Sequence, residues 1–507
     1  MADIKKLKTI ARKLQKLTTR YSRLEWVQYT TGYDLGVQPA YRKMVNLLKD
    51  RDNFRVVEEC RAAGLETVDR RRAEIMYLAF RPYHLSEELN RLDLEIQKLS
   101  SRLAQLLNTH RSVIAGREVR STEISQILSE DPDRERRKGA YLARAQVNRP
   151  LSEGGFLELL GLRREYARLY GAADYAACRL EQQELEPGLF RNWPDEAARL
   201  RPEVDRVRAE YGEKFLADPE VMPWDEAYLS AQLAPELNRP VDMSEYQLRL
   251  NDFFGRLGFD LARHNITYDI FPRRNKSEWG YSFDIETAKD SRILANVENR
   301  YHEYGVLLHE TGHALHSSLL NPRESILNLG VSGIIAEGLA NLFGDFLYHP
   351  AFFKGMFPGQ AEEAGRHFQD LRRWDRASRI AALPGILFDQ ALYREKIGSL
   401  DDIHQLYWRI YQEILGRRPY AEEPTWGFRI HHTTHPIYLH NYFMGDLSGD
   451  MLKAAFLNRT GAAEVMDRPR EFGKFILDEV IAPSGLYTFS QLYRRISGED
   501  FSLSYLA

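Results

Sequence analysis

The stretch VLLHETGHALH, residues 306–316, contains the pattern His-Glu-x-x-His. Apolar residues flank this pattern at helical spacing, which predicts a helix from about Arg300 to Leu319. On a helix, His309 and His313 are four residues apart and lie one above the other on the same face. Two imidazoles at that spacing can share one metal ion, while Glu310 beside them takes a proton from a metal-bound water. The pattern therefore predicts a catalytic metal site carried by this helix.

A third ligand is expected, because a catalytic zinc usually has three protein ligands and one open position. Glu337 lies early in a second predicted helix, Ser332–Leu347, among residues that are mostly small or apolar. A carboxylate is costly in such surroundings unless it is paired or bound to a metal, although an exposed surface glutamate is the alternative. We predict that His309, His313 and Glu337 bind one Zn(2+) ion per chain, a position that manganese or cobalt could also occupy.

Three neighbouring residues have less specific interpretations. His316 continues the stripe of the two predicted histidine ligands, but a third ligand from the same helix would leave Glu337 unused, so we interpret it as a buried histidine beside the site. Asp345 is a candidate acceptor for a ligand histidine N–H, with a simple surface charge as the alternative. Gly312 inside the helix costs about 1 kcal/mol relative to alanine, which is tolerated where a neighbouring element must approach closely.

A second cluster of polar aromatic residues lies downstream. The segment HHTTHPIYLHNY, residues 431–442, holds four of the 14 histidines and two tyrosines. Attack of water on a peptide carbonyl places negative charge on the carbonyl oxygen, and O–H or N–H groups aimed at that oxygen lower the barrier. Aromatic packing around a buried histidine is the alternative for each single residue. For the cluster as a whole, we predict a catalytic role.

Composition excludes several other classes of function. The 507 residues are 43% hydrophobic, and 70 basic residues against 73 acidic ones give a net charge of -3. No global field therefore favours nucleic acid. No stretch approaches 18 apolar residues, so no membrane span is predicted. Two cysteines, Cys60 and Cys178, are too few for a disulfide framework and suit a reducing compartment. We expect a cytoplasmic protein without nucleic acid or membrane partners.

Helical periodicity dominates the chain. The N-terminal residues 4–17 form a basic amphipathic pattern. A leucine-rich heptad run indicates one long helix, or else a dimeric coiled coil: Leu85, Leu89, Leu92, Ile96, Leu99, Leu103 and Leu107. Further predicted helices cover residues 156–170, 196–217, 244–257, 361–380, 386–396 and 402–415.

One region departs from this pattern. Runs rich in β-forming residues occur at Ile266–Phe271, Gly280–Ile285 and Ile293–Val297, directly before the metal helix. The sequence thus predicts a mostly α protein with a small β-sheet before the HExxH helix. We expect a single two-lobed unit, 1–507, with a deep cleft. Within it we expect an N-terminal helical lid region over 1–150 and a catalytic region over 151–507.

These residues resemble the zinc oligopeptidase group of thimet oligopeptidase and oligoendopeptidase F, related to angiotensin-converting enzyme and carboxypeptidase Taq. The specific matches are HETGHALH at 309–316, the region of Glu337 and the His/Tyr segment. Fainter matches are Leu162–Tyr175 and the carboxyl-terminal Ile496–Leu503. The likeness covers about residues 155–507.

The resemblance implies specific roles. His309, His313 and Glu337 would be the zinc ligands and Glu310 the general base. His432 and Tyr442 would stabilise the oxyanion, with Tyr438 as a further donor. The group also implies a narrow channel that admits short peptides, and a strand ahead of the metal helix that pairs with substrate backbone, here Ile293–Val297.

The expected function is hydrolysis of peptide bonds in short oligopeptides. A metallocarboxypeptidase or dipeptidyl carboxypeptidase is the alternative, which a contact of Arg273, Arg274 or Arg429 with a free carboxylate would favour. The chain is shorter than most of these oligopeptidases, and no clear lysine matches the one that binds the substrate carboxylate in angiotensin-converting enzyme. A non-catalytic helical binding protein is the third possibility, against which the intact Glu310 argues. The chain is expected to be a monomer or a homodimer.

Overall fold

The computed structural model describes residues 3–277 and 280–506 and is mostly helical, with two small sheets. The predicted fold class, a helical zinc-peptidase body with a small sheet before the metal helix, is confirmed. The chain divides into two compact units. The first unit comprises Met1–Leu85, Glu236–Ala361 and Met444–Phe501. The second unit comprises Ser86–Pro235, Glu362–Phe443 and Ser502–Ala507. The proposed division into a lid over 1–150 and a catalytic region over 151–507 stays a prediction.

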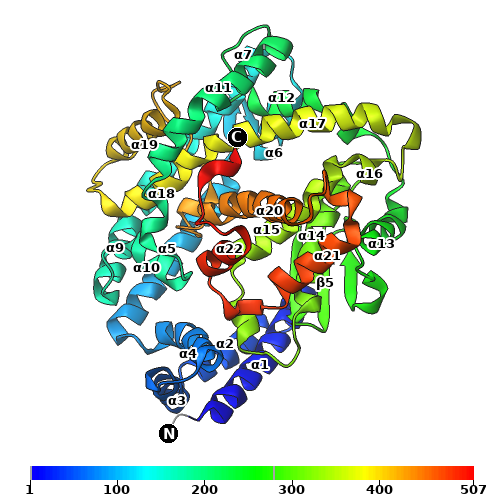
Figure 1. Ribbon diagram of the computed structural model, residues 1–507. Coiled ribbons are helices and arrows are strands. Elements are labelled where there is room, and N and C mark those ends of the chain that lie inside the picture. The colour runs from blue at the N-terminus through cyan, green and yellow to red at the C-terminus, as the bar shows by residue number, and fades with distance from the viewer. Residues whose placement is uncertain (1–2, 278–279, 507) are drawn as a thin grey trace. The chain divides into compact units, whose positions relative to one another are not determined.

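The first unit begins with four helices that lie together (Figure 1): α1 (Ile4–Thr31), α2 (Val37–Leu48), α3 (Arg51–Ala62) and α4 (Thr67–Phe80). Asp3 caps α1 by accepting the backbone N–H of Lys6 at 2.9 Å, and Gly32 ends it in a left-handed conformation. The apolar stripe predicted from the sequence is buried in α1 at Leu7, Ile10 and Leu14. The later helices of this unit are α13 (Tyr246–Arg256), α14 (Glu303–Leu319), α15 (Gly333–Gly344), α16 (Pro350–Phe353), α21 (Pro469–Phe475) and α22 (Phe489–Ser497).

A three-stranded sheet precedes α14, as predicted, in the order β3-β5-β4. Its strands are β3 (Ile266–Asp269), β4 (Tyr281–Glu286) and β5 (Asp290–Leu294). β5 pairs in parallel with β3 and antiparallel with β4. The expectation that Ile293–Val297 pairs with substrate is therefore wrong for Ile293 and Leu294, because a central strand has both edges occupied. The strand itself begins earlier than predicted, at Asp290.

The α1 helix covers one side of β4 through aromatic contacts. The rings of Trp26 and Phe283 meet edge to face with centroids 5.4 Å apart, and those of Tyr29 and Tyr281 at 5.3 Å. Tyr281 and Phe283 are two residues apart and so lie on the same face of the strand. This packing fixes β4 beside α1 within the first unit.

The second unit is built from α5 (Glu87–Thr109), the hairpin of β1 (Ser112–Ile114) and β2 (Arg117–Val119), and further helices. These are α6 (Ser121–Glu130), α7 (Arg134–Ala143), α8 (Asn148–Leu151), α9 (Leu157–Tyr170), α10 (Tyr175–Gln182), α11 (Trp193–Leu216), α12 (Glu226–Leu233), α17 (Ala361–Ser378), α18 (Leu383–Arg394) and α19 (Leu400–Leu415). The boundary between the units falls inside α20 (Leu439–Thr460).

The leucine run of α5 faces the interior of its own chain, since Leu89, Leu92, Ile96, Leu99 and Leu103 are buried. The interpretation as one long helix packed on its neighbours is thus confirmed. The six further predicted helices all form, with ends that differ by a few residues. The β1–β2 hairpin was not predicted from the sequence.

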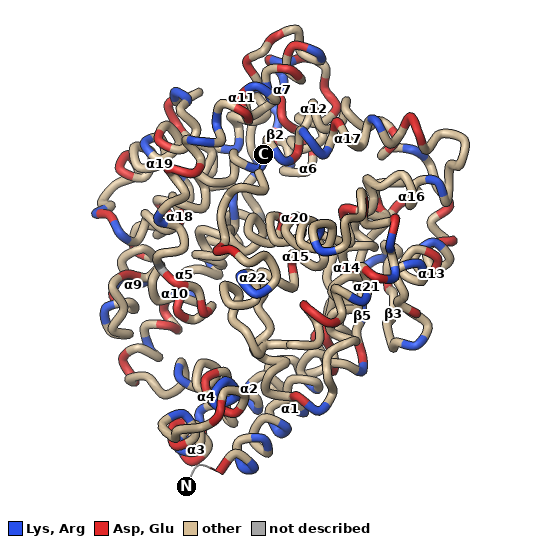
Figure 2. The backbone as a smooth tube through the Cα atoms, viewed as in Figure 1, with Lys and Arg blue, Asp and Glu red and all other residues tan. Residues whose placement is uncertain are grey.

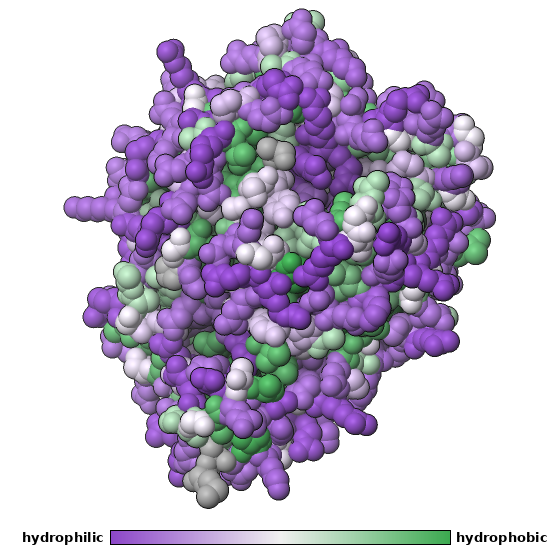
Figure 3. Space-filling model, in the orientation of Figure 1, coloured by the Kyte–Doolittle hydropathy of each residue, from purple (hydrophilic) through white to green (hydrophobic). Residues whose placement is uncertain are grey.

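The surface is charged and mixed. Hydrophilic residues cover most of the face shown in Figure 3, and both signs of charge recur along the backbone, with basic residues frequent on α1 (Figure 2). Both cysteines are buried free thiols, as expected. Among residues 3–277 and 280–506, no helix is long and apolar enough to cross a membrane.

Candidate metal centre

The predicted metal ligands come together on two helices of the first unit. His309 and His313 lie on one face of α14, with ring centroids 4.8 Å apart and the rings nearly perpendicular. Glu337 reaches them from α15. Its Oε2 is 3.8 Å from the Nε2 of His309 and 3.6 Å from the Nε2 of His313.

This donor set fits a zinc ion. Ligands about 2.0–2.1 Å from a tetrahedral zinc lie about 3.4 Å from one another, close to the separations seen here. One atom from each of the three side chains lies within 4.8 Å of the others, and no other such trio of His, Cys, Asp or Glu occurs in the described part of the chain. Each side chain is 21–27% exposed, so the ligand atoms remain reachable. The three predicted residues therefore form a candidate zinc site.

Glycines allow the helices that carry the ligands to approach closely. A Cβ on Gly312 of α14 would lie 3.0 Å from the Cα of Ala340 on α15. A Cβ on Gly344, the last residue of α15, would likewise lie 3.4 Å from the Cβ of His309. On the other side of α15, a Cβ on Gly445 of α20 would be 3.0 Å from the Cβ of Glu337. The expectation that Gly312 permits a close neighbour is thus confirmed, and the neighbour is a helix backbone.

The electrostatics of the trio favour a neutral His309 beside an ionised Glu337. Burial, followed by the nearby His313, lowers the pKa of His309 to about 4. Burial alone would raise the pKa of Glu337, but the hydrogen bond and charge of His313 outweigh it and hold that pKa below its ordinary value. Deprotonated histidines and an ionised glutamate are the forms that bind a metal ion.

Glu310 lies next to the ligands and is buried, with 8% of its surface exposed. Burial raises its pKa to about 7, and the charge of Glu337 adds to the rise while His313 opposes it. Gly280, the residue before β4, lies beside this carboxylate, because a Cβ at that position would be 3.6 Å from Oε1 of Glu310.

The residues around the ligands differ in what they contact. His316 is buried, as expected, and its Nε2 has no hydrogen-bond partner among the described residues. Asp345 accepts a hydrogen bond from the Nζ of Lys453 at 2.8 Å, and its contact with a ligand histidine stays a prediction. Asn341, which the sequence analysis missed, hydrogen-bonds His309 and donates to Asp446 at 2.7 Å. The sequence feature that could have indicated Asn341 is its position one helical turn after Glu337.

The whole His/Tyr segment, residues 431–442, belongs to the second unit. His432 is buried there, its Nδ1 3.4 Å from Oδ1 of Asp389 and its ring against Phe388. The backbone N–H of Ile437 donates to the other carboxylate oxygen of Asp389 at 2.7 Å. Asp389 thus holds two points of the segment, at His432 and at Ile437.

Tyr438 and Tyr442 pack with a different histidine. Their ring centroids are 5.4 Å apart, and the ring of His431 lies 5.7 Å from that of Tyr442. Burial, followed by the charges of His432 and Arg429, lowers the pKa of His431 to about 4. The rings of a neutral His431, Tyr438 and Tyr442 therefore pack together as one aromatic cluster. The residue Tyr442 in this cluster is 44% exposed to solvent.

Two residues that position this segment, Arg163 and Asp389, were not predicted from the sequence. Arg163 of α9 is buried and donates to the backbone carbonyl of His432 at 2.8 Å, and it also bonds that of Thr433. Asp389 of α18 stands in an apolar run, which is the same signal that identified Glu337. Arg163 lies inside the faintly matching stretch Leu162–Tyr175, but a single arginine there carries no distinctive pattern.

Comparison with known proteins supports the fold. No family model matches the sequence, and no curated protein does. The M32 carboxypeptidase from Deinococcus radiodurans R1 is similar in structure, with a TM-score of 0.65 and 14% identity over 99% of this chain and 97% of that one. A protein assigned as oligoendopeptidase F has a TM-score of 0.73 and 14% identity, over 98% of this chain and 89% of that one. Pz peptidase A with an inhibitor has a TM-score of 0.67 and 14% identity, over 99% of this chain and 94% of that one. The chain therefore has the fold of the zinc oligopeptidase group, with a His309-His313-Glu337 site within it.

Proposed function

We propose that this chain is a zinc-dependent metallopeptidase that hydrolyses peptide bonds in short oligopeptides. One observation carries the proposal: one ligand atom from each of two imidazoles and one carboxylate lies within 4.8 Å of the others, with a buried glutamate adjacent to them. A purely structural zinc would usually have four protein ligands and no need of such a base. The similarity in fold to carboxypeptidases and oligopeptidases supports the same function.

Glu310 is the proposed general base. His309, His313 and Glu337 would hold the zinc ion, which would polarise the substrate carbonyl and lower the pKa of the attacking water. The carboxylate of Glu310 takes a proton from that water and later passes it to the leaving amine. Burial raises the pKa of this carboxyl above that of an exposed glutamate, which makes its carboxylate a stronger proton acceptor.

Tyr442, Tyr438 and His432 are the proposed stabilisers of the oxyanion. The phenol O–H groups and a neutral imidazole N–H are suitable donors to a developing negative charge. His431 joins this proposal because its ring packs against Tyr442, whereas His432 is buried against Asp389. We propose that His432 acts mainly by holding the segment in place, together with Asp389.

The β4 strand is the proposed edge for substrate backbone. It pairs with β5 on one side, and no described strand pairs with its other side. Gly280 at its start lies against Glu310, so a peptide added along this edge would pass the proposed base. An extended peptide gains main-chain hydrogen bonds when it adds to a sheet edge in this way.

A carboxypeptidase is the second candidate. The similar structure from Deinococcus radiodurans is an M32 carboxypeptidase, which favours removal of residues from the carboxyl end. Of the arginines considered for binding a terminal carboxylate, Arg273 pairs with Asp269 and donates to the carbonyl of Thr30. Its guanidinium is thus already engaged, which leaves Arg274 and Arg429 as candidates. Dipeptidyl carboxypeptidase activity would use the same site.

A peptide library separates these activities. The zinc-loaded protein is incubated with mixed peptides of about 5–20 residues, sizes that a restricted site would admit, and the products are read by mass spectrometry. Internal cuts that are absent with a Glu310→Gln control would establish an endo-oligopeptidase. Ladders of products from the carboxyl end would instead establish a carboxypeptidase. Equal cleavage by the control would contradict the proposed function, and an absence of cleavage would favour a helical binding protein.

A further inference from the structure

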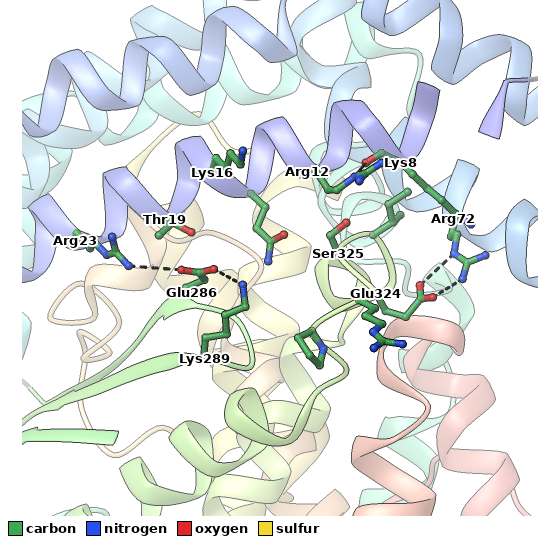
Figure 4. A pocket seen from close by; sticks show the side chains of 14 residues that line it. Lys8, Arg12, Lys16, Thr19, Arg23, Arg72, Glu286, Lys289, Glu324 and Ser325 are labelled. Atoms are coloured by element: carbon green, nitrogen blue, oxygen red, sulfur yellow. Dashed lines mark hydrogen bonds and ion pairs between the residues drawn. The ribbon is translucent and has the colours of Figure 1, made fainter. Parts of the chain in front are cut away.

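A second site lies in the first unit, in a cavity of about 820 Å³. One side of it is formed by a face of α1 between Lys8 and Arg23 (Figure 4). The turn between β4 and β5 and the segment 322–326 that follows α14 form the rest, together with Arg72 of α4. Elements far apart in the sequence therefore enclose one space.

The side chains that line this cavity are predominantly basic. Two carboxylates, Glu286 and Glu324, face seven basic side chains: Lys8, Arg12, Lys16, Arg23, Arg72, Lys289 and Arg323. Neutral hydrogen-bonding groups, among them Gln15, Thr19 and Ser325, lie between the charges. A cavity with this composition attracts anions, although the net charge of the whole chain is slightly negative.

Both carboxylates are neutralised by basic neighbours. Glu286 pairs with Lys289 at 2.6 Å and with Arg23 at 3.5 Å, at one end of the cavity. Glu324 accepts two hydrogen bonds from Arg72, of 2.6 and 3.2 Å, at the other end. Figure 4 shows these two groups at opposite ends of the α1 face.

Of the four remaining cations, Lys8 lies 4.0 Å from Oδ1 of Asp69, and the other three have no acidic partner among the described residues. Arg12, Lys16 and Arg323 form no ion pair within the described residues, and Arg12 donates only to the Lys8 carbonyl and to Thr9. Arg12 and Lys16 are one turn apart on α1, while Arg323 comes from the segment after α14. Three uncompensated charges therefore converge from two elements on one cavity.

We propose that this cavity binds a soluble oligophosphate, an anion that carries several adjacent phosphate groups. Guanidinium groups bind phosphate oxygens in pairs, and lysine adds a mobile charge, so Arg12, Arg323 and Lys16 suit such a ligand. A single phosphate would neutralise at most two of the three charges. The volume lies within the range of small-molecule sites, which is about 300–1,000 Å³.

The ligand would join elements that support the metal helix. The turn between β4 and β5 is tied to α14, because the backbone N–H of Ala288 donates to the carbonyl of Ser317 at 3.0 Å. Ser317 lies one turn beyond His313 on α14. An anion that connects α1 with the segment after α14 would therefore stabilise the first unit against unfolding. This inference does not depend on the proposed peptidase activity.

Calorimetric titration of the full-length protein with inorganic triphosphate tests the proposal. The double variant Arg12→Glu/Lys16→Glu should weaken binding by about tenfold or more, because two attractive charges become repulsive. Lys13→Glu is the matched control, an exposed charge reversal on the same helix outside the cavity, and should change binding by less than about threefold. All three proteins retain the same zinc site, so chelation of zinc by triphosphate contributes equally to each.

Each result of the triphosphate titration either supports or overturns the proposed site. Selective weakening in the double variant, with an unchanged melting temperature in the absence of triphosphate, supports the site. Equal weakening by Lys13→Glu would show a diffuse charge effect and overturn it, as would the absence of triphosphate binding to the unmodified chain. Co-sedimentation with vesicles of an anionic phospholipid, without binding of soluble triphosphate, would assign the basic face of α1 to a membrane surface and also overturn the proposal.

Discussion

Gly312 of α14 and Ala340 of α15 are in backbone contact: a Cβ on Gly312 would lie 3.0 Å from the Cα of Ala340 and 3.0 Å from the ring of Phe343. This contact sets the distance between the helix that carries both histidines and the helix that carries Glu337. The separation of the ligand atoms depends on it.

Replacing Gly312 with alanine should destabilise the protein. Overpacking costs about 1–3 kcal/mol, which exceeds the gain in helix propensity of about 1 kcal/mol. Urea denaturation measures the change. Gly161→Ala in α9 is the matched control, since its Cβ would meet no atom within 4 Å, and it should leave stability unchanged or slightly raised. A Gly312→Ala variant as stable as that control would refute the close contact.

Glu337→Ala should remove most of the zinc affinity. Loss of a group that merely orients a ligand costs up to about 100-fold in affinity, so loss of a ligand should cost more. Competition with a fluorescent zinc chelator gives the dissociation constant. Glu362→Ala removes a carboxylate whose side chain is 96% exposed and should leave the affinity unchanged. Similar zinc affinity in both variants would exclude Glu337 as a ligand.

Tyr442→Phe should lower the rate of the chemical step without loss of zinc or stability. Removal of one donor to an oxyanion costs about 100–1,000-fold in kcat. Tyr442 is 44% exposed, so removal of one oxygen atom leaves no closed cavity in the core. Steady-state kinetics on a cleaved peptide, beside a Tyr33→Phe control at a 69% exposed position, measures the effect. A variant with full kcat would remove Tyr442 from the catalytic group.

The three side chains of the candidate metal centre could be grouped from the sequence because most of the information is local. His309 and His313 are ordered by one helix, so their spacing in the sequence already determines their spacing in the structure. Glu337 could be identified because a carboxylate in an apolar run requires a partner. The same argument applies to Asp389, which we did not use.

The rest of the site depends on tertiary contacts that the sequence does not encode locally. Which edge of the sheet is open follows from strand order, and β5 became central because β3 pairs with it across a long connection. The choice between His431 and His432 depends on which ring turns towards Tyr442, and Asp389 and Arg163 decide that orientation. Neighbouring residues of one type offer no sequence signal for that choice.

Stability should fall with acidification partly through His440. Burial lowers the pKa of its imidazole to about 4, and its Nε2 contacts Oε1 of Gln183 at 2.9 Å. Below about pH 6.5 the unfolded chain binds a proton that the folded chain refuses, so stability declines by about 1.4 kcal/mol per pH unit until pH nears 4. His440→Gln removes this contribution while keeping a hydrogen-bonding side chain.

Urea unfolding at pH 7 and pH 5 tests this effect. Between those values the unmodified protein should lose about 2 kcal/mol more than the His440→Gln variant. The difference in unfolding free energy between the two proteins at pH 7, where His440 is mostly neutral in both the folded and the unfolded state, measures any packing defect of the variant separately from the pH effect. Equal losses on acidification would contradict a buried, neutral His440.

The most direct test of the central claim compares peptide hydrolysis by the unmodified protein and by Glu310→Gln at equal zinc occupancy. Each sample is loaded with one zinc ion per chain, verified by elemental analysis, and the cleavage rate of one peptide is measured. We predict that the variant retains zinc and loses turnover by at least about 100-fold, the lower range for general acid-base catalysis. Unchanged hydrolysis by the zinc-loaded variant would contradict the assignment of Glu310 as the base, and with it the proposed mechanism.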